Sequence, residues 1–374
     1  ADIRPDNSFN YSWRVRVWDE TDTPSEWSSE AKFRAVPERL SSGQWIGAIT
    51  RQNAHLPEGR KFHGGELKKP EVKAAWEAVD TLAKKSICLR RTFQVGDAAE
   101  GGTNRKPGKK IVEATAYVCG LGFYEFSLNG KKVGNSEFTP LWSDYDKTVY
   151  YNTYDVTEQL RRGENVVGIL LGNGFYNVQG GRYRKLQISF GPPTLLFELV
   201  INYEDGTCTA VHSDNNWKYD FSPVTFNCIY GGEDYDARRE QKGWNQIGFD
   251  DSHWRPVVMQ EAPKGILRPQ MAAPVKIMER YDIQKVTKLN ADQVASASVS
   301  TKRTVDPSAF VLDMGQNLAG FPEITVRGKR GQKVTLIVAE ALTEEGACNQ
   351  RQTGRQHYYE YTLKGEGDET WHPR

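Results

Sequence analysis

The stretch YDVTEQLRRGENVVGILLGNGFYN, residues 154–177, decides the fold class of this chain. Its apolar run at 166–171 has the length of one strand and stops abruptly at the sequence GNG, residues 172–174. A short apolar run between turn residues indicates a strand buried in a β-sandwich core. Before it, the DVT motif at 155–157 can cap a turn that Gly163 closes with a positive φ. The stretch therefore predicts a core strand followed by a glycine-hinged loop that carries two amides and two aromatic rings.

The rest of the chain has the same β character. Residues 10–18, NYSWRVRVW, alternate with a period of two, which predicts a half-buried strand, and residues 30–35 predict a second one. Farther on, short strand-like runs are separated by turn pairs, of which Asn129-Gly130 is a strong hairpin signal. One short helix is expected at residues 70–85, where apolar residues recur at spacings of three and four after a proline. Many short strands at this spacing are typical of β-sandwiches.

Composition excludes two classes of partner. The 374 residues are enough for two or three domains, and 49 Lys+Arg against 48 Asp+Glu give a net charge of +1. This balance does not indicate nucleic acid or an anionic membrane surface, because both call for a basic patch. A transmembrane helix needs about 20 apolar residues, and no apolar run approaches that length.

The cysteines and the first residues leave the compartment open. The number of cysteines is odd and no CxxC pair occurs, so zinc and thioredoxin-like sites are unsupported and buried free thiols are expected. Residues 1–5 are polar and do not form a signal peptide. The chain is therefore either cytosolic or begins downstream of a processed end. The cysteines are Cys88, Cys119, Cys208, Cys228 and Cys348.

Several motifs together resemble the bacterial α-L-rhamnosidases of glycoside hydrolase family 78. They are LGFYE (121–125), LNGKKVG (128–134), PLWSDY (140–145), YDVT (154–157), LGNGFY (171–176), YGGEDYDAR (230–238) and DMGQNLAG (313–320). The resemblance covers nearly the whole chain. It implies β-sandwich modules followed by an (α/α)6 barrel that carries the catalytic carboxylates and is absent from these residues. The implied partners are this barrel of the same polypeptide and a rhamnose-containing glycan, and the family favours a periplasmic or secreted location.

With this resemblance, the fold class is mainly β, with tandem β-sandwiches and a short helix, in three segments. Residues 1–36 resemble the last strands of a fibronectin type III module. Residues 37–260 are expected to form a jelly-roll domain of the galactose-binding-like type, with a linker and the helix at 70–85. Residues 261–374 are expected to form a second β-sandwich that is truncated at its C-terminal end, because no polar tail follows its last strand.

The loop after the core strand is our candidate sugar site. Asparagine amides donate and accept hydrogen bonds, as sugar hydroxyls require, and aromatic faces pack against sugar C–H groups. The alternative is a glycine-rich loop whose asparagines satisfy its own backbone. The predicted sugar-binding residues are Asn129, Trp142, Asn173, Phe175, Tyr176 and Asn177.

Oxygen-bearing side chains on nearby loops suit Ca²⁺, which takes six to eight oxygen ligands. The candidate ligands are Glu125, Asn129 and Asp144. No EF-hand pattern is present, and no cofactor is required by the chemistry expected of this segment. Some jelly-roll domains of the family are calcium-dependent rhamnose-binding modules, so the resemblance implies Ca²⁺ here as an option.

The acidic run at 233–240 does not qualify as a glycosidase acid–base pair. Arg238 and Arg239 stand beside the acids and would hold them ionised with lowered pKa values. We therefore expect a structural ion-pair network and assign no catalytic residue. The six histidines show no metal-binding spacing.

Three functions stay open at this point. The chain is the accessory portion of an inverting α-L-rhamnosidase, a free-standing lectin-like carbohydrate-binding protein, or a purely structural spacer. A beginning inside a sandwich favours the first, because a self-contained lectin would include all of its strands. On this interpretation the segment alone is inactive.

Overall fold

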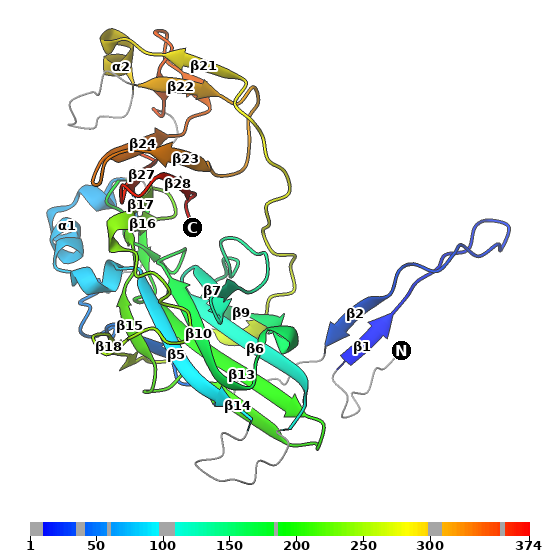
Figure 1. Cartoon of the computed structure of the whole chain (residues 1–374). Coiled ribbons are helices and arrows are strands. Elements are labelled where there is room, and N and C mark those ends of the chain that lie inside the picture. The colour runs from blue at the N-terminus through cyan, green and yellow to red at the C-terminus, as the bar shows by residue number, and fades with distance from the viewer. Residues whose placement is uncertain are drawn as a thin grey trace. The chain divides into compact units, whose positions relative to one another are not determined.

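The computed structural model describes residues 10–34, 42–57, 61–96, 109–182, 186–297, 309–351 and 356–374. The chain forms two compact units, residues 1–41 and residues 42–374. Almost all regular structure consists of strands, and the helices are short (Figure 1). The prediction of a mainly β fold with tandem sandwiches and a short helix is confirmed.

The first unit is a two-stranded ribbon. Strands β1 (Asn10–Trp13) and β2 (Ala31–Arg34) pair antiparallel. Beyond β1 the alternating stretch stays paired with its return segment, because the Ser28 and Ser25 amides donate to the carbonyls of Val15 and Val17, both at 2.8 Å. The Arg16 guanidinium lies over the rings of Trp18 and Trp27, at 4.7 and 4.8 Å. A complete fibronectin-like sandwich stays a prediction.

In the second unit, two sheets pack face to face and form the jelly-roll sandwich. The first has the strand order β18-β15-β5-β10-β7-β8. Its strands are β18 (Arg255–Pro256), β15 (Lys218–Phe221), β5 (Ile87–Val95), β10 (Gly163–Leu171), β7 (Tyr124–Leu128) and β8 (Lys131–Lys132). The second has the order β19-β3-β13-β6-β9-β20, with β14 paired to β13. Its strands are β19 (Val258–Met259), β3 (Ile46–Gly47), β13 (Thr194–Tyr203), β6 (Ile111–Leu121), β9 (Thr148–Asp155), β20 (Ile266–Pro269) and β14 (Cys208–His212).

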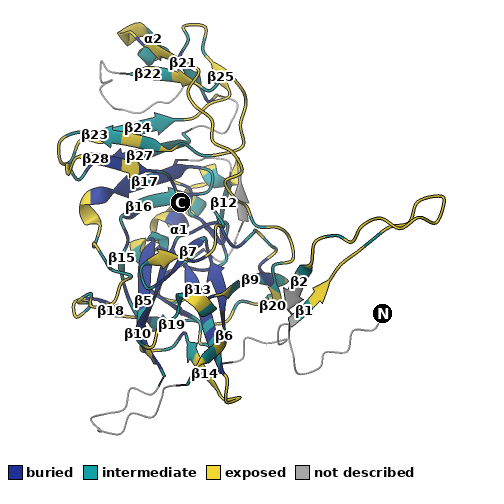
Figure 2. Cartoon of the chain, turned by 45° about the vertical axis from the view of Figure 1, so that its right-hand side comes forward, coloured by how far each residue is buried: buried dark blue, intermediate teal, exposed yellow. Residues whose placement is uncertain are grey.

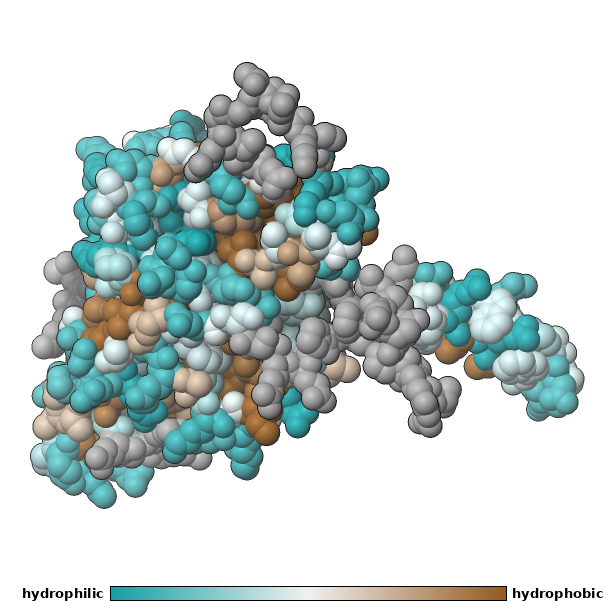
Figure 3. Space-filling view, turned by 90° about the horizontal axis from the view of Figure 1, so that it is seen from below, coloured by the Kyte–Doolittle hydropathy of each residue, from teal (hydrophilic) through white to brown (hydrophobic). Residues whose placement is uncertain are grey.

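The two sheets share one hydrophobic core. Figure 2 shows β5, β10, β13 and β6 mostly in the dark blue of buried residues. Phe126 of β7 contacts Phe197 of β13 edge to face at 5.7 Å, and Phe197 contacts Trp217 at 5.3 Å. The face drawn in Figure 3 is mainly hydrophilic, with apolar side chains in separate patches. Burial of these apolar side chains stabilises the sandwich, at roughly 1.5–3 kcal/mol for each large one.

The opening stretch of the sequence forms the strand that it predicts. Strand β10 lies between β5 and β7, and its residues 165–171 are all buried. Before β10, Asp155 accepts hydrogen bonds from the backbone amide and hydroxyl of Thr157, and Gly163 has a φ of 83°. The hairpin prediction is also confirmed, because Asn129 (φ 53°) and Gly130 (φ 83°) form the turn between β7 and β8.

The predicted helix at 70–85 is shorter in the structure. Helix α1 (Pro70–Glu77) begins at the expected proline, and a separate 3₁₀ turn, η2 (Thr81–Lys84), follows. Asp80 interrupts the helix because its backbone is extended and its carboxylate caps η2 through the Leu82 amide at 2.7 Å. The apolar periodicity continues across this break because Trp76, Val79 and Ala83 all enter one small core.

A four-stranded sheet joins two distant parts of the chain. Its order is β16-β17-β27-β24, and β17 and β27 are parallel. The strands are β16 (Val224–Cys228), β17 (Gly232–Asp236), β27 (Tyr358–Thr362) and β24 (Lys333–Ile337). Residues on both sides of the predicted boundary at 260 thus share one sheet, and β20, which follows that boundary, pairs with β9 of the jelly roll.

The remaining elements are small. Three strand pairs are β21 (Lys285–Lys288) with β22 (Phe310–Asp313), β23 (Ile324–Arg327) with β28 (Asp368–Trp371), and β25 (Ala341–Leu342) with β26 (Cys348–Asn349). A three-stranded sheet contains β11 (Asn177–Val178), β12 (Leu186–Ser189) and β4 (Lys61–His63). The short helices are α2 (Ala291–Ser296), η1 (Glu66–Lys68), η3 (Thr157–Gln159) and η4 (Ala237–Arg239).

Two further predictions concern membranes and thiols. No helix in the described ranges is long and apolar enough to cross a membrane. The cysteines are free, and Cys88, Cys119 and Cys228 are buried as expected. The expectation is wrong for Cys208, which is exposed because it lies on β14 at the edge of its sheet.

Candidate functional site

The loop after β10 is held by close backbone contacts. Gly122 has a φ of 126°, and a Cβ atom there would lie 2.0 Å from the carbonyl oxygen of Gly172. Gly174 has a φ of 51°, and its Cβ atom would lie 2.7 Å from the backbone nitrogen of Phe123. These glycines therefore allow two protein loops to approach each other, and the close approach that the sequence suggested is between backbones.

Asn173 and Asn177 are buried inside this loop. The Asn173 amide nitrogen donates to the Lys84 carbonyl at 2.9 Å and to the Asn227 side-chain oxygen at 2.8 Å. Asn177 donates to the Asn173 side-chain oxygen at 2.8 Å and to the Ala83 carbonyl at 2.9 Å. Only 0% and 1% of their surfaces are exposed. This geometry favours the alternative, in which the amides satisfy the protein's own polar groups. Sugar contacts of Asn173 and Asn177 stay a prediction.

Two of the three candidate calcium ligands, Glu125 and Asn129, lie too far apart to bind one ion. Asn129 receives a hydrogen bond from the Val166 amide at 2.9 Å and donates to the Asn165 side chain at 2.9 Å, which fixes the hairpin turn. Glu125 lies on the same β7 strand, about 10 Å from its end at the typical rise per residue. Asp144 forms an ion pair with Lys147 at 3.2 Å. Ca²⁺ ligands must lie within about 2.6 Å of one ion, so Glu125 and Asn129 cannot share a site in this arrangement.

The predicted aromatic residues separate into two groups. Trp142 is 64% exposed, and its ring stacks on Phe175 with centroids 5.5 Å apart and planes 29° from parallel. Phe175 also contacts Tyr230 at 6.2 Å. We call Trp142, Phe175 and Tyr230 the aromatic patch. Tyr176 is instead buried and donates its hydroxyl to the Phe190 carbonyl at 3.1 Å, beside a hollow of about 120 Å³.

A larger cavity lies between the jelly roll and the four-stranded sheet. Its volume is about 180 Å³, and its walls come from β7, the loop after β10, β16, β17 and β27. We call it the inter-sheet cavity. Three of its lining residues are carboxylic acids, of which two lie on different strands: Glu125 on β7 and Glu233 on β17, with Glu137 in a loop. The cavity thus combines titratable groups that lie far apart in the sequence.

Glu233 is the most unusual acid in the cavity wall. Its side chain is 3% exposed, one oxygen accepts from the Arg374 backbone amide at 3.2 Å, and the other has no hydrogen-bond partner. The pKa of Glu233 is raised to about 8, mainly by burial. The hydrogen bond and the charge of Arg374 act against this rise, and the charges of Asp234 and Glu125 add to it. Burial also lowers the pKa of the neighbouring His357 and raises that of Tyr359 to about 12.

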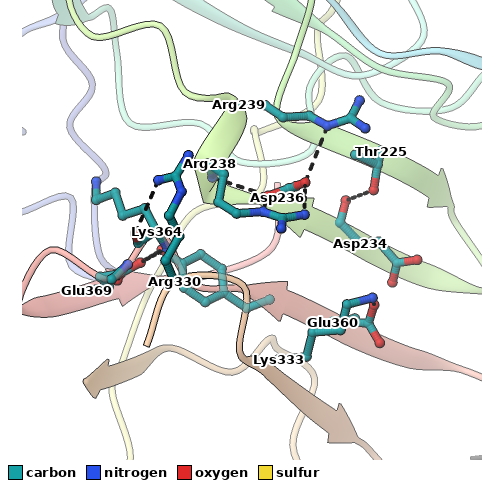
Figure 4. A network of polar contacts seen from close by, with 12 residues as sticks. Thr225, Asp234, Asp236, Arg238, Arg239, Arg330, Lys333, Glu360, Lys364 and Glu369 are labelled. Atoms are coloured by element: carbon teal, nitrogen blue, oxygen red, sulfur yellow. Dashed lines mark hydrogen bonds and ion pairs between the residues drawn. The ribbon is translucent and has the colours of Figure 1, made fainter. Parts of the chain in front are cut away.

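The other acids of the 233–240 run form the predicted ion-pair network. Asp234 pairs with Arg182, and Glu240 pairs with Lys364 at 2.8 Å. Figure 4 shows Asp236 held by Arg238 and Arg239, at 2.8 and 3.3 Å. The hydrogen bond from Arg238 lowers the pKa of Asp236.

For Glu233 the prediction of a lowered pKa is wrong. Side chains alternate along β17, so Glu233 leaves the strand on the opposite face from Asp234 and lies away from the arginines. The alternation of side chains along GEDYD, residues 232–236, is the sequence signal that could have placed Glu233 and Asp234 on opposite faces of the strand.

Comparisons with known proteins agree with the motifs. The α-L-rhamnosidase N-terminal domain model matches residues 109–279, and the bacterial α-L-rhamnosidase concanavalin-like domain model matches residues 303–374. The chain belongs to the bacterial α-L-rhamnosidase family. An α-L-rhamnosidase of Formosa agariphila is 33% identical over 97% of this rhamnosidase-family chain, which spans 36% of that relative's length.

Solved structures show the same architecture. The α-L-rhamnosidase from Dictyoglumus thermophilum superimposes with a TM-score of 0.72 and 29% identity over 98% of this chain and 36% of its own. The Streptomyces avermitilis α-L-rhamnosidase complexed with L-rhamnose has a TM-score of 0.76 and 24% identity over 99% of this chain and 47% of its own. At that identity the likeness concerns the fold alone.

Proposed function

We propose that this chain is the accessory β-sandwich portion of an α-L-rhamnosidase that hydrolyses terminal α-L-rhamnosides with inversion. The observation that carries the proposal is the match of two successive rhamnosidase domain models in a chain that spans 36% of its relative's length. Inversion needs two carboxyl groups about 6.5–9.5 Å apart, one acting as acid and one as base. Most acids of the 233–240 run are engaged in ion pairs, so we place the catalytic pair in a barrel elsewhere in the polypeptide.

An extended segment offers a surface for that barrel. Residues 270–284 contain almost no regular structure and connect β20 with β21. Their apolar side chains face outward: Met271 is 88% exposed and Met278 is 84% exposed, and four other residues are between 42% and 46% exposed. Exposed apolar patches mark interaction surfaces. We infer that the catalytic domain of the same polypeptide covers this segment. The four other residues are Val275, Ile277, Tyr281 and Ile283.

The absence of activity in this portion is directly testable. We expect the 374-residue chain to release no rhamnose from an aryl α-L-rhamnoside above the uncatalysed rate, because the catalytic acids lie outside it. The measurement is a colorimetric release assay at pH 5, 7 and 9, and the control is an active α-L-rhamnosidase under the same conditions. Turnover that disappears in the Glu233→Gln variant would contradict the assignment of this chain as accessory.

We further propose that the aromatic patch binds sugar. Trp142 presents an exposed ring that Phe175 supports from behind, and such faces pack against the C–H side of a pyranose. Replacing Trp142 with alanine should weaken L-rhamnose binding about tenfold, which corresponds to the loss of roughly 1.4 kcal/mol of aromatic contact.

Isothermal titration of L-rhamnose measures this effect, with and without EDTA to test Ca²⁺. The matched control is Trp18→Ala, which removes an equally large ring that is 54% exposed in the other unit. Equal binding by both variants would remove the patch from the proposal, whereas no binding by the unmodified chain would leave a structural spacer.

A further inference from the structure

We propose that the inter-sheet cavity is a second binding site, for a neutral polyhydroxylated molecule of about monosaccharide size, with the Glu233 carboxyl as its central hydrogen-bonding group. This site goes beyond the proposed function and does not depend on the aromatic patch.

The size of the cavity fits a small organic molecule better than an ion. A water molecule takes about 30 Å³ in the liquid, so 180 Å³ holds at least about six of them. The described residues contain no group of three or more His, Cys, Asp or Glu that could hold a metal ion. The walls come from the jelly roll and from the four-stranded sheet. A bound molecule would therefore lie between strand β7 on one side and strands β16, β17 and β27 on the other.

One oxygen of the buried Glu233 carboxyl, Oε1, has no hydrogen-bond partner in the protein. A buried polar atom without a partner costs about 1–3 kcal/mol, and nearly all such atoms in proteins are paired. The unpartnered oxygen belongs to a side chain that lines the cavity and is more than nine-tenths buried. A hydroxyl group of a ligand would supply the partner. With a pKa of about 8 the carboxyl is largely protonated at neutral pH, so it can both donate to and accept from such a hydroxyl.

The charges around the cavity favour a neutral ligand. Lys132 and Glu137 neutralise each other in an ion pair at 2.7 Å. Glu125 and Arg374 also line the cavity, and these side chains of opposite formal charge interact with each other. A ligand with a net charge would therefore meet no uncompensated partner. Sugar hydroxyls both donate and accept, which matches the protonated Glu233 carboxyl, because that group can do the same.

The apolar part of the wall completes the match to a sugar. Phe123 and Phe138 lie side by side with centroids 5.8 Å apart, and both line the cavity together with Leu170 and Val224. Small-molecule sites typically combine such apolar surface with a few convergent polar groups. The chemistry therefore indicates a compact molecule with hydroxyls on one side and C–H surface on the other.

The test uses the whole chain and a panel of probes. L-rhamnose, D-glucose, D-galactose and D-mannose are the neutral sugars, and D-glucuronate and D-glucosamine are charged controls. Saturation-transfer NMR identifies the binders, and isothermal titration measures their dissociation constants. We expect at least one neutral sugar to bind the Trp142→Ala variant, to bind Glu233→Leu at least tenfold more weakly, and to bind Glu233→Gln within about threefold of the wild type.

A second variant keeps the test informative if Glu233→Leu does not fold. Ser136 is a partly exposed lining residue, and Ser136→Trp should block the cavity without touching Glu233. The proposal is overturned if no neutral sugar binds, if a charged probe binds more tightly than every neutral one, or if binding is lost in Trp142→Ala and unchanged in Glu233→Leu and Ser136→Trp. That last outcome would leave the aromatic patch as the sugar site.

Discussion

Replacing Glu233 with glutamine is expected to raise the free energy of unfolding by roughly 3 kcal/mol at pH 7. Burial raises the pKa of this carboxyl from 4.5 to about 8 in the folded state. Between these two values the folded chain keeps the proton and the unfolded chain loses it. The stabilising effect of the protonated side chain is thus fully present below pH 4.5 and is lost as the pH rises toward 8. Glutamine has nearly the same shape and does not ionise, so the variant escapes this loss.

Urea unfolding at pH 4.5, 6, 7 and 8 measures the effect. The wild type and the variant should have similar stability at pH 4.5, and their difference should grow up to pH 8. Glu340→Gln is the matched control, because Glu340 is exposed, and its change should stay within about 0.5 kcal/mol at every pH. A difference between wild type and Glu233→Gln that does not vary with pH would show that Glu233 does not titrate in this range.

Replacing Asn173 with alanine is expected to lower the free energy of unfolding by about 3 kcal/mol. The side chain bonds the Lys84 carbonyl, the Asn227 side chain and the Asn177 side chain; the bond with Asn177 is buried and the other two are partly buried. Alanine removes all three hydrogen bonds together, and an intramolecular hydrogen bond typically contributes about 0.5–1.5 kcal/mol.

Chemical denaturation at pH 7 measures this loss, with Asn215→Ala as the control at an exposed asparagine, where a change below about 0.5 kcal/mol is expected. The result also separates the two interpretations of the loop. A variant of unchanged stability that no longer binds L-rhamnose would show that the amide faces a ligand, contrary to the geometry described above.

Local patterns carried the prediction of the fold. The apolar run of β10 and the Asn129-Gly130 hairpin depend on neighbours within a few positions, and the structure follows both. The alternation of residues 10–18 predicted the antiparallel pairing but not the burial, because Trp13, Val15 and Val17 are 49–67% exposed. The helix was predicted too long because Asp80 prefers to cap a new turn, which the apolar spacing does not reveal. Family motifs, which depend on order along the chain, led to the family that the comparisons show.

The candidate site was less accessible to this reasoning. By residue type, Asn173 and Trp142 were equally good candidates for sugar binding. In the structure Asn173 is fully buried, whereas Trp142 is 64% exposed. Polar residues have the same chemistry inside and outside a protein, so their type does not decide whether they serve the fold or a ligand. Glu233 was grouped with its ion-paired neighbours because adjacent positions on a strand look alike in a list but face opposite sides of a sheet.

The amino-acid order alone determined that this chain is built from β-sandwiches, because strand periodicity and turn chemistry are local properties. The rhamnosidase family came from the resemblance of its motifs. Only the tertiary structure decided that β17 pairs in parallel with β27 across more than a hundred residues, and that Glu233 meets Glu125 at one cavity. Such contacts between distant residues depend on how sheets stack and on which face of a strand turns inward. Both are set by the burial of the whole core and not by any short stretch of residues.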